Sequence, residues 1–102
     1  MNVTVPRRIL GRVADWTFLT NHAHVLLCIA MDPESRFREI GDRVGITEGA
    51  AQRIVADLIE TGYLSKERHG RRNVYSIHRE LHLRHPIEQH AEVGSLLAML
   101  NA

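Results

Sequence analysis

The stretch from residue 36 to residue 64 constrains the fold of this 102-residue chain more than any other part. Its apolar residues recur at intervals of three and four, which predicts two short helices, the first ending near Val44 and the second over about residues 48–60. Gly45 follows the first helix directly, where glycine adopts the left-handed conformation at no steric cost. Thr47 can accept a hydrogen bond from the free N–H groups that open the second helix. This spacing predicts a helix–turn–helix pair, the unit that places its second helix in the major groove of DNA.

The predicted pair packs through one apolar face on each helix. The two faces consist of Phe37, Ile40 and Val44 on the first helix and of Ala51, Ile54 or Val55, and Leu58 on the second. Gly41 lies on the first helix where a side chain would keep the second helix from closing in. We therefore expect the two helices to cross closely at Gly41.

A basic β-hairpin is predicted directly after the pair, over residues 64–78. Val74, Tyr75 and Ile77 favour a strand, and His69-Gly70 begins a polar tip. Five basic residues and one acidic residue lie between positions 66 and 79, although the formal net charge of the chain is only +1. Basic charge concentrated on one element is typical of a nucleic-acid contact.

The end of the second helix strengthens this interpretation. The segment Ile59-Glu60-Thr61-Gly62-Tyr63-Leu64 resembles the L-E-x-x-G-[LY]-[LI] ending of the recognition helix in winged-helix regulators of the MarR and ArsR kind, and a basic hairpin follows it. The resemblance covers about residues 20–78. It implies a mainly α winged helix-turn-helix with a small β-hairpin and additional N- and C-terminal helices. It also implies a transcriptional regulator that binds double-stranded DNA sequence-specifically.

The predicted DNA-binding residues lie on the second helix and on the hairpin, which corresponds to the wing of that fold. They are Thr47, Glu48, Gly49, Ala50, Gln52 and Arg53 on the helix, and Lys66, Arg68, Arg71 and Arg72 on the wing. Gln52 can read adenine and Arg53 can read guanine through paired hydrogen bonds. Gly49 allows a close backbone approach, and Thr47 can contact phosphate from the helix N-terminus. The wing cations would hold the DNA backbone or the minor groove.

The remaining residues flank this domain, which divides the chain into residues 1–19, 20–78 and 79–102. Pro6 could open a helix at about Arg7, either for dimerisation or as a basic arm, and a loosely docked terminus is the alternative. The aromatic cluster that follows, Trp16, Phe18 and Leu19, is expected to plug the core.

Two further helices are predicted. The first runs from His22 to Met31, is capped by Thr20-Asn21 and is stopped by Asp32-Pro33. Its expected core-facing residues are Ala23, Leu26, Leu27 and Ala30. The second opens at Pro86 and runs through Leu100. It would pair with its twin, since a two-fold symmetric DNA site requires a dimer, or it would fold back over its own core.

Other classes of function have weaker support. His78 and His82 straddle a strand end and Pro86 separates His85 from the helix, so no metal site is predicted. Cys28 lies in an apolar helix, where a thiol is usually inert, although His24 shares its face. A gated regulator needs a metal, a thiol or a ligand pocket, and the sequence shows no such pocket. A winged helix that binds a partner protein is the main alternative.

No enzyme and no cofactor are predicted, because the chain has no Gly-rich phosphate loop and no Ser/His/Asp arrangement. It also has no apolar run of membrane-spanning length and no signal peptide. Its single cysteine cannot form an internal disulfide. We therefore expect a cytoplasmic protein without a membrane partner.

Overall fold

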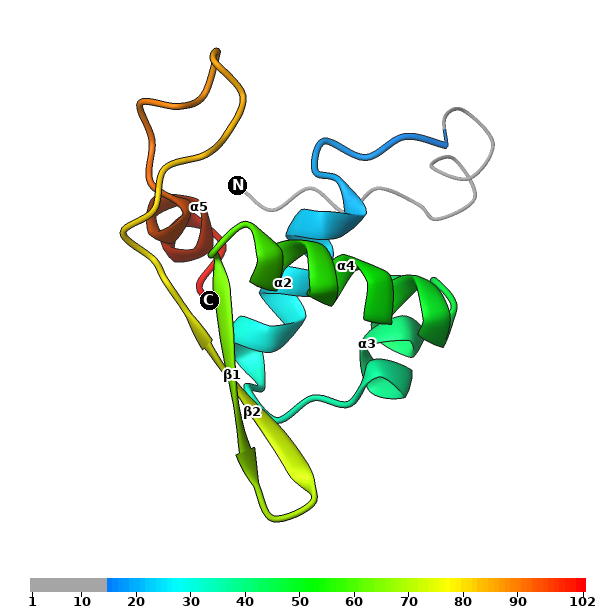
Figure 1. Ribbon diagram of the computed structural model, residues 1–102. Coiled ribbons are helices and arrows are strands. Elements are labelled where there is room, and N and C mark those ends of the chain that lie inside the picture. Colours follow the sequence, from blue (N-terminus) through cyan, green and yellow to red (C-terminus); the bar gives the residue numbers. More distant parts are fainter. Residues whose placement is uncertain (1–14) are drawn as a thin grey trace.

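The computed structural model of the chain describes residues 15–102, and the predicted helix near Arg7 lies outside them. The described elements are, in order, α2 (Asn21–Met31), α3 (Phe37–Val44), α4 (Glu48–Glu60), β1 (Leu64–His69), β2 (Arg72–Ile77) and α5 (Val93–Met99). Figure 1 shows α2, α3 and α4 gathered into one body from which the β-hairpin projects. This arrangement confirms the predicted class, a mainly α winged helix-turn-helix with a small β-hairpin.

The corner between α3 and α4 has the predicted geometry. Gly45 adopts the left-handed conformation with φ 87°, and its N–H donates to the Gly41 carbonyl at 2.8 Å. The Thr47 hydroxyl oxygen accepts from the N–H of Ala50 at 3.0 Å and so caps α4. A Cβ atom on Gly41 would lie only 2.8 Å from the carbonyl oxygen of Ile46. The crossing of α3 and α4 therefore requires glycine at position 41.

The core is one aliphatic cluster that draws on every described helix and on both strands. Its buried members are Val25, Leu26, Cys28, Ile29, Ile40, Ala51, Ile54, Val55, Leu58, Tyr63, Leu64, Tyr75, Val93 and Leu97. On α2 the expected inward face was only partly right, because Leu27 and Ala30 are just half-buried while Val25 and Ile29 are fully buried. Almost every residue of α2 after His24 is apolar, so the spacing of apolar residues could not select a face.

The predicted aromatic plug is wrong. Phe18 is 93% exposed, Trp16 is also exposed, and Leu19 is half-buried. The two rings pack edge-to-face on each other, with their centroids 5.1 Å apart, rather than into the body. The core cluster is built from residues of the four helices and the hairpin, without these two rings.

The predicted C-terminal helix from Pro86 to Leu100 is also wrong in extent, because α5 begins at Val93. The N–H of Leu83 donates to the Ala91 carbonyl at 2.9 Å, and the N–H of Val93 donates to the Leu81 carbonyl at 2.8 Å. These bonds tie the two ends of residues 82–92 together, so Pro86 lies in a protruding loop. We call residues 82–92 the arm.

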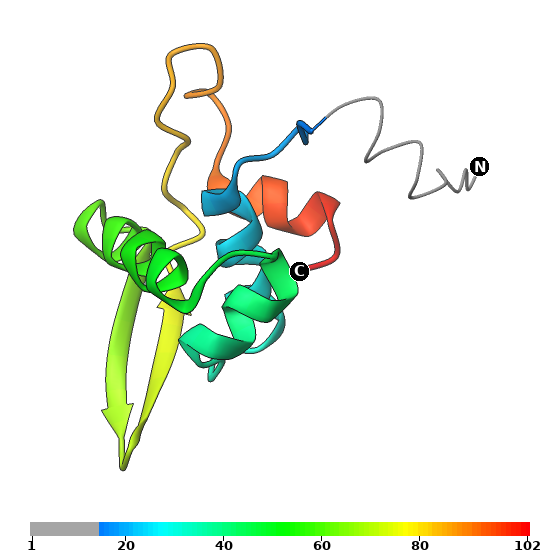
Figure 2. The same ribbon diagram turned by 90° about the vertical axis from the view of Figure 1, so that its right-hand side faces the viewer.

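The α5 helix folds back over its own core, which is the second of the two arrangements that the sequence left open. Val93 and Leu97 are buried in the common core cluster. A Cβ atom on Gly94 would lie 2.9 Å from the carbonyl oxygen of Arg79, so glycine allows α5 to approach the chain that leaves β2. Figures 1 and 2 both show the arm extending from the body at the end opposite the hairpin tip.

The hairpin confirms the predicted wing. Its strands pair antiparallel from Leu64 opposite Ile77 to His69 opposite Arg72, and Gly70 forms the tip with φ 65°. The N–H of Tyr75 donates to the Pro33 carbonyl at 2.9 Å, which fastens β2 to the turn between α2 and α3. Among residues 15–102 no helix is long and apolar enough to cross a membrane.

Candidate nucleic-acid interface

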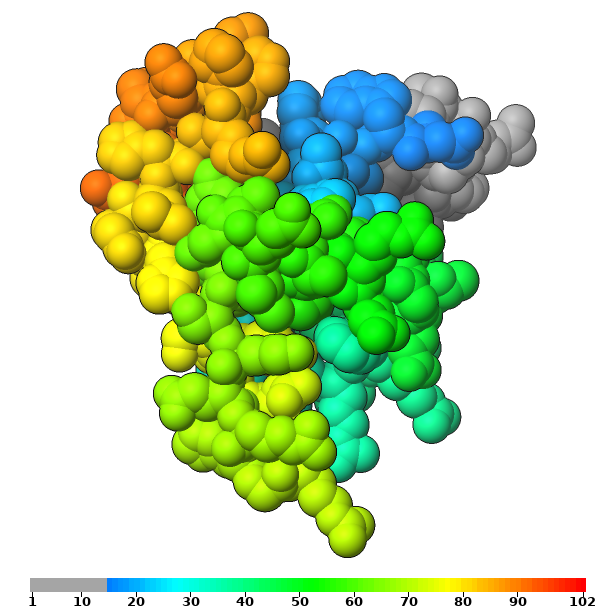
Figure 3. Space-filling view, viewed as in Figure 1, coloured from blue at the N-terminus to red at the C-terminus, as the bar shows by residue number. Residues whose placement is uncertain are grey.

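The α4 helix and the hairpin share one face of the molecule. In the space-filling view α4 crosses the middle of this face and the hairpin continues it below (Figure 3). Figure 2 shows α4 at the outer edge of the body. Ala51, Ile54, Val55 and Leu58 turn inward and hold α4 in place. The opposite side of α4 is therefore open to solvent along its length.

The predicted residues of α4 lie on this open side. Thr47, Glu48, Gly49, Gln52 and Arg53 are exposed, and Ala50 is half-buried. Gly49 and Arg53 are four residues apart, and so are Glu48 and Gln52, so each pair lies on the same helix face. The structure thus brings the predicted base-reading residues together at the N-terminal half of α4.

The predicted wing residues divide into two groups. Lys66 and Arg68 pair in register with Tyr75 and Asn73, which places them on the ribbon face that carries buried Tyr75. Both cations are nevertheless exposed, because the ribbon extends beyond the body. The Nε–H of Arg68 donates to the Gly70 carbonyl at 3.2 Å, so the turn itself orients this guanidinium.

Arg71 and Arg72 differ in their surroundings. Arg71 is exposed at the tip, and within residues 15–102 it forms no ion pair. Arg72 lies on the opposite ribbon face from Lys66, and its Nη1 is 3.7 Å from a carboxylate oxygen of Glu34. This carboxylate partly neutralises Arg72, so Lys66, Arg68 and Arg71 carry most of the available positive charge.

Acidic side chains of α4 gather toward its C-terminal half. Asp57 and Glu60 are exposed there, and Asp57 Oδ2 is 2.9 Å from His22 Nε2 on α2. These carboxylates would repel phosphate. The charge distribution therefore favours a DNA contact at the N-terminal half of α4 and on the wing.

The cysteine and the histidines that were considered as sensing residues have other surroundings or partners in the structure. Burial raises the pKa of the Cys28 thiol above its ordinary value, although Arg43 nearby acts in the opposite direction. The thiol stays protonated at neutral pH and is a poor nucleophile. His82 Nδ1 is 2.7 Å from the Gln89 carbonyl oxygen, and His85 Nδ1 accepts from the N–H of Ile87 at 3.1 Å. The described part of the chain contains no group of three His, Cys, Asp or Glu residues that could hold a metal ion.

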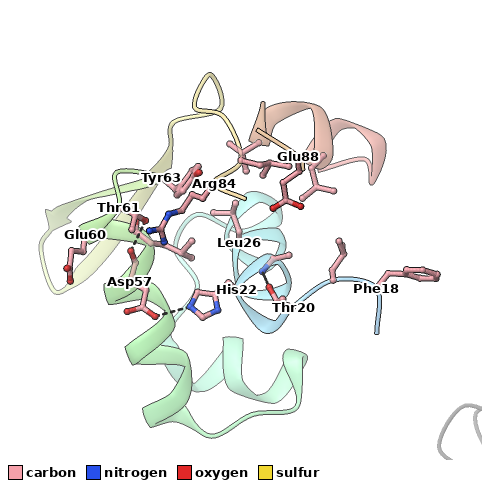
Figure 4. Close-up of a pocket in the computed structure, with 16 residues that line it drawn as sticks. Phe18, Thr20, His22, Leu26, Asp57, Glu60, Thr61, Tyr63, Arg84 and Glu88 are labelled. Atoms are coloured by element: carbon pink, nitrogen blue, oxygen red, sulfur yellow. Dashed lines mark hydrogen bonds and ion pairs between the residues drawn. The ribbon is translucent and has the colours of Figure 1, made fainter. Parts of the chain in front are cut away.

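Sequence reasoning missed a cavity of about 700 Å³ beside the C-terminal end of α4. It lies between the N-terminal end of α2, the C-terminal half of α4, the arm and α5, and we call it the groove (Figure 4). Its apolar lining includes Leu26, Leu58, Val93 and Leu96. Because the arm was expected to be helical, nothing in the sequence pointed to a hollow beside it.

Comparison with known proteins identifies the family. The sequence model of the MarR family matches residues 17–72, more than half of the chain. The chain belongs to the MarR family. This MarR-family chain is also similar to a solved structure, the PcaV transcriptional regulator from Streptomyces coelicolor in complex with its natural ligand. The two share 26% sequence identity with a TM-score of 0.54, over 81% of this chain and 57% of PcaV. No curated protein matches.

The comparisons confirm the predicted MarR-like winged helix. The chain spans a little over half the length of PcaV. The family match ends at Arg72, so the rest of β2, the arm and α5 lie beyond the matched residues.

Proposed function

We propose that this MarR-family chain is a transcriptional regulator that binds double-stranded DNA sequence-specifically as a homodimer. The α4 helix enters the major groove, and the wing holds the backbone or the minor groove. The observation that carries the proposal is the shared face in Figure 3, on which the exposed side of α4 and the basic wing lie together. Family membership supports the same function.

Each part of this face has a distinct chemical role. Gln52 and Arg53 read base edges, because an amide suits adenine and a guanidinium suits guanine. Glu48 and Ala50 shape the fit, and Gly49 leaves room for close approach, since nothing lies within 4 Å of a Cβ atom built there. Thr47 caps the helix and lies where a helix N-terminus can hold a phosphate. The wing residues Lys66, Arg68, Arg71 and Arg72 supply contacts that do not depend on sequence.

A salt titration tests the proposal against its main alternative, a winged helix that binds a partner protein. The full chain should retain a random DNA duplex at low salt, and the logarithm of its affinity should fall linearly with the logarithm of the salt concentration. Selection from a random duplex pool should then return a two-fold symmetric site. Failure to bind any duplex at low salt would contradict the proposal and favour the protein-binding alternative.

Replacement of Arg53 by alanine should weaken binding to the selected site by about 1–3 kcal/mol and relax the preference at one base pair, because a paired guanidinium–guanine contact is lost. Affinity for random duplex should change much less. Arg79→Ala is the charge-matched control, since Arg79 lies beyond the wing and donates to the carbonyl oxygen of Ala102. If Arg53→Ala and Arg79→Ala lost equal affinity, both on the selected site and on random duplex, Arg53 would not read a base.

Replacement of Arg71 by alanine should affect DNA binding differently from replacement of Arg53. Because the tip arginine neutralises a phosphate, binding should weaken on all sequences alike, and the steepness of the salt dependence should fall by about 1. Competition titrations of selected and random duplexes at four salt concentrations measure both quantities. An unchanged slope would remove Arg71 from the interface.

A further inference from the structure

The two faces of the wing differ in how their charges are paired. Lys66 and Arg68 share the first face, and in the described part of the chain neither forms an ion pair. On the second face Arg72 lies directly opposite His69, and Glu67 is the next side chain of β1 on that face. His69 Nε2 is 3.5 Å from Glu67 Oε2. The first face is therefore free to meet an anion, whereas the second already contains acidic partners.

A second carboxylate reaches this face from outside the wing. Glu34 lies in the turn between α2 and α3, and its Oε1 is 3.7 Å from Arg72 Nη1. Figure 1 shows the connection between α2 and α3 leaving the body next to β2. The ion pair thus joins the body of the domain to a cation of the proposed DNA contact.

The turn that presents Glu34 is shaped by its own hydrogen bonds. The N–H of Glu34 donates to Asp32 Oδ1 at 3.1 Å. The hydroxyl of buried Ser35 donates to the Asp32 carbonyl at 2.8 Å. The Pro33 carbonyl in turn accepts from the N–H of Tyr75 on β2 at 2.9 Å. These bonds hold the Glu34 carboxylate beside the wing whether or not the ion pair is formed.

The ion pair itself can open at little cost. The side chains of Arg72 and Glu34 are 48% and 54% exposed. An exposed pair contributes little to stability, because water screens the charges and two long side chains must be ordered. A phosphate can accept two parallel hydrogen bonds from a guanidinium, which makes it a strong competitor for Arg72. DNA can therefore replace the carboxylate without disturbing the fold.

We propose that Glu34 competes with DNA phosphate for Arg72. Its carboxylate occupies Arg72 in the free protein and gives way to a backbone phosphate in the complex. Glu34 is then a positioning residue that acts through Arg72 and lowers the affinity of the wing for every duplex, since a phosphate contact does not depend on sequence. Base reading by α4 thereby supplies a larger share of the binding free energy. This inference rests on the DNA-binding function proposed above and adds a residue to it.

A double-mutant cycle of Glu34→Gln and Arg72→Gln tests the inference, by titration of a random duplex with the full chain at four salt concentrations. Glu34→Gln alone should raise the affinity at low salt about two- to fivefold, as expected for the loss of an exposed pair. The salt dependence should become steeper by up to about 0.9, because Arg72 neutralises a phosphate without a competing carboxylate. In the Arg72→Gln background, Glu34→Gln should change neither quantity.

The charge-matched control is Glu80→Gln. Glu80 is exposed and follows β2 at the end of the wing away from its tip. This variant should bind the duplex like the parent. All variants should keep the parent's melting temperature, since the replaced side chains lie at the surface, and this separates the loss of a competitor from a change in fold.

Nuclear magnetic resonance of the Arg72 side chain gives a second readout that does not depend on affinity. In the free protein, Glu34→Gln should shift the Arg72 Nε–H resonance, because the carboxylate partner is lost. With saturating random duplex the parent and the variant should give the same resonance, because phosphate is the partner in both. Identical resonances in the two free proteins would overturn the inference, since no ion pair would then exist to be displaced.

The cycle also distinguishes this inference from the proposed function. If the parent binds duplex and Glu34→Gln raises the affinity equally in the parent and in the Arg72→Gln background, Glu34 repels DNA directly, and the inference alone fails. An unchanged affinity of Glu34→Gln would overturn it as well. If the parent binds no duplex at low salt, the DNA-binding function fails, and the inference fails with it.

Discussion

Gly41→Val should lower the free energy of unfolding by about 3 kcal/mol, the upper part of the range for overpacking a close contact. A Cβ atom at Gly41 would lie 2.8 Å from the carbonyl oxygen of Ile46 and 3.3 Å from the carbonyl carbon of Thr47. Both are backbone atoms of the corner, so no side-chain rotation can relieve the contact. The corner must open, and the start of α4 must move with it. Urea denaturation measures the loss.

The matched control is Gly49→Val on α4, where nothing lies within 4 Å of a Cβ atom. It should leave the free energy of unfolding within about 0.5 kcal/mol of the parent, as is usual for surface substitutions. Conditions in which Gly41→Val is still folded allow a second comparison, made with the parent because Gly49 itself lies on the proposed DNA-binding face. There Gly41→Val should also weaken binding to the selected DNA site, because Gln52 and Arg53 move with α4. Equal stability of the two variants would contradict the tight corner on which the proposed function depends.

This corner could be predicted from sequence because its determinants are local. Gly45 ends α3 through its own backbone conformation, and Thr47 caps α4 through a bond to a residue three positions away. The wing is similar, since a short loop between two β-prone runs sets both the pairing and the register. The exposure of the base-reading residues then follows from which side of α4 is apolar.

The failed predictions concern segments whose conformation depends on distant neighbours. Trp16 and Phe18 are apolar enough for a core, but both rings are exposed and pack on each other. Pro86 is compatible with the first turn of a helix and with a loop. Hydrogen bonds between residues 81–83 and 91–93 decide for the loop, and local spacing does not encode them.

The charge surroundings of the candidate site were predictable only in part. The sequence showed where basic residues concentrate but could not show that Glu34 reaches Arg72 from the turn before α3. The groove could not be predicted from the sequence either, because its lining comes from three separate stretches of the chain. Such features arise from tertiary packing and need coordinates.

The α5 helix could belong to the protomer core or form the contact between two copies, and Leu97→Ala distinguishes these two arrangements. Leu97 is 0% exposed in the core, so its truncation should cost about 2–5 kcal/mol in the free energy of unfolding. Met99→Ala, on the same helix where the side chain is 70% exposed, should stay within about 0.5 kcal/mol of the parent. Urea denaturation at two protein concentrations measures both, because subunit association adds a concentration-dependent contribution.

Association of the folded Leu97→Ala variant gives the sharper result. If α5 belongs to the protomer core, the variant should have the parent's dimer dissociation constant wherever it is still folded, because Leu97 is buried in the core cluster of its own protomer. If α5 were a dimerisation helix, as its apolar spacing first suggested, the loss would appear in the dissociation constant and the protomer would keep its stability. That second pattern would show that α5 joins the two copies of the proposed homodimer.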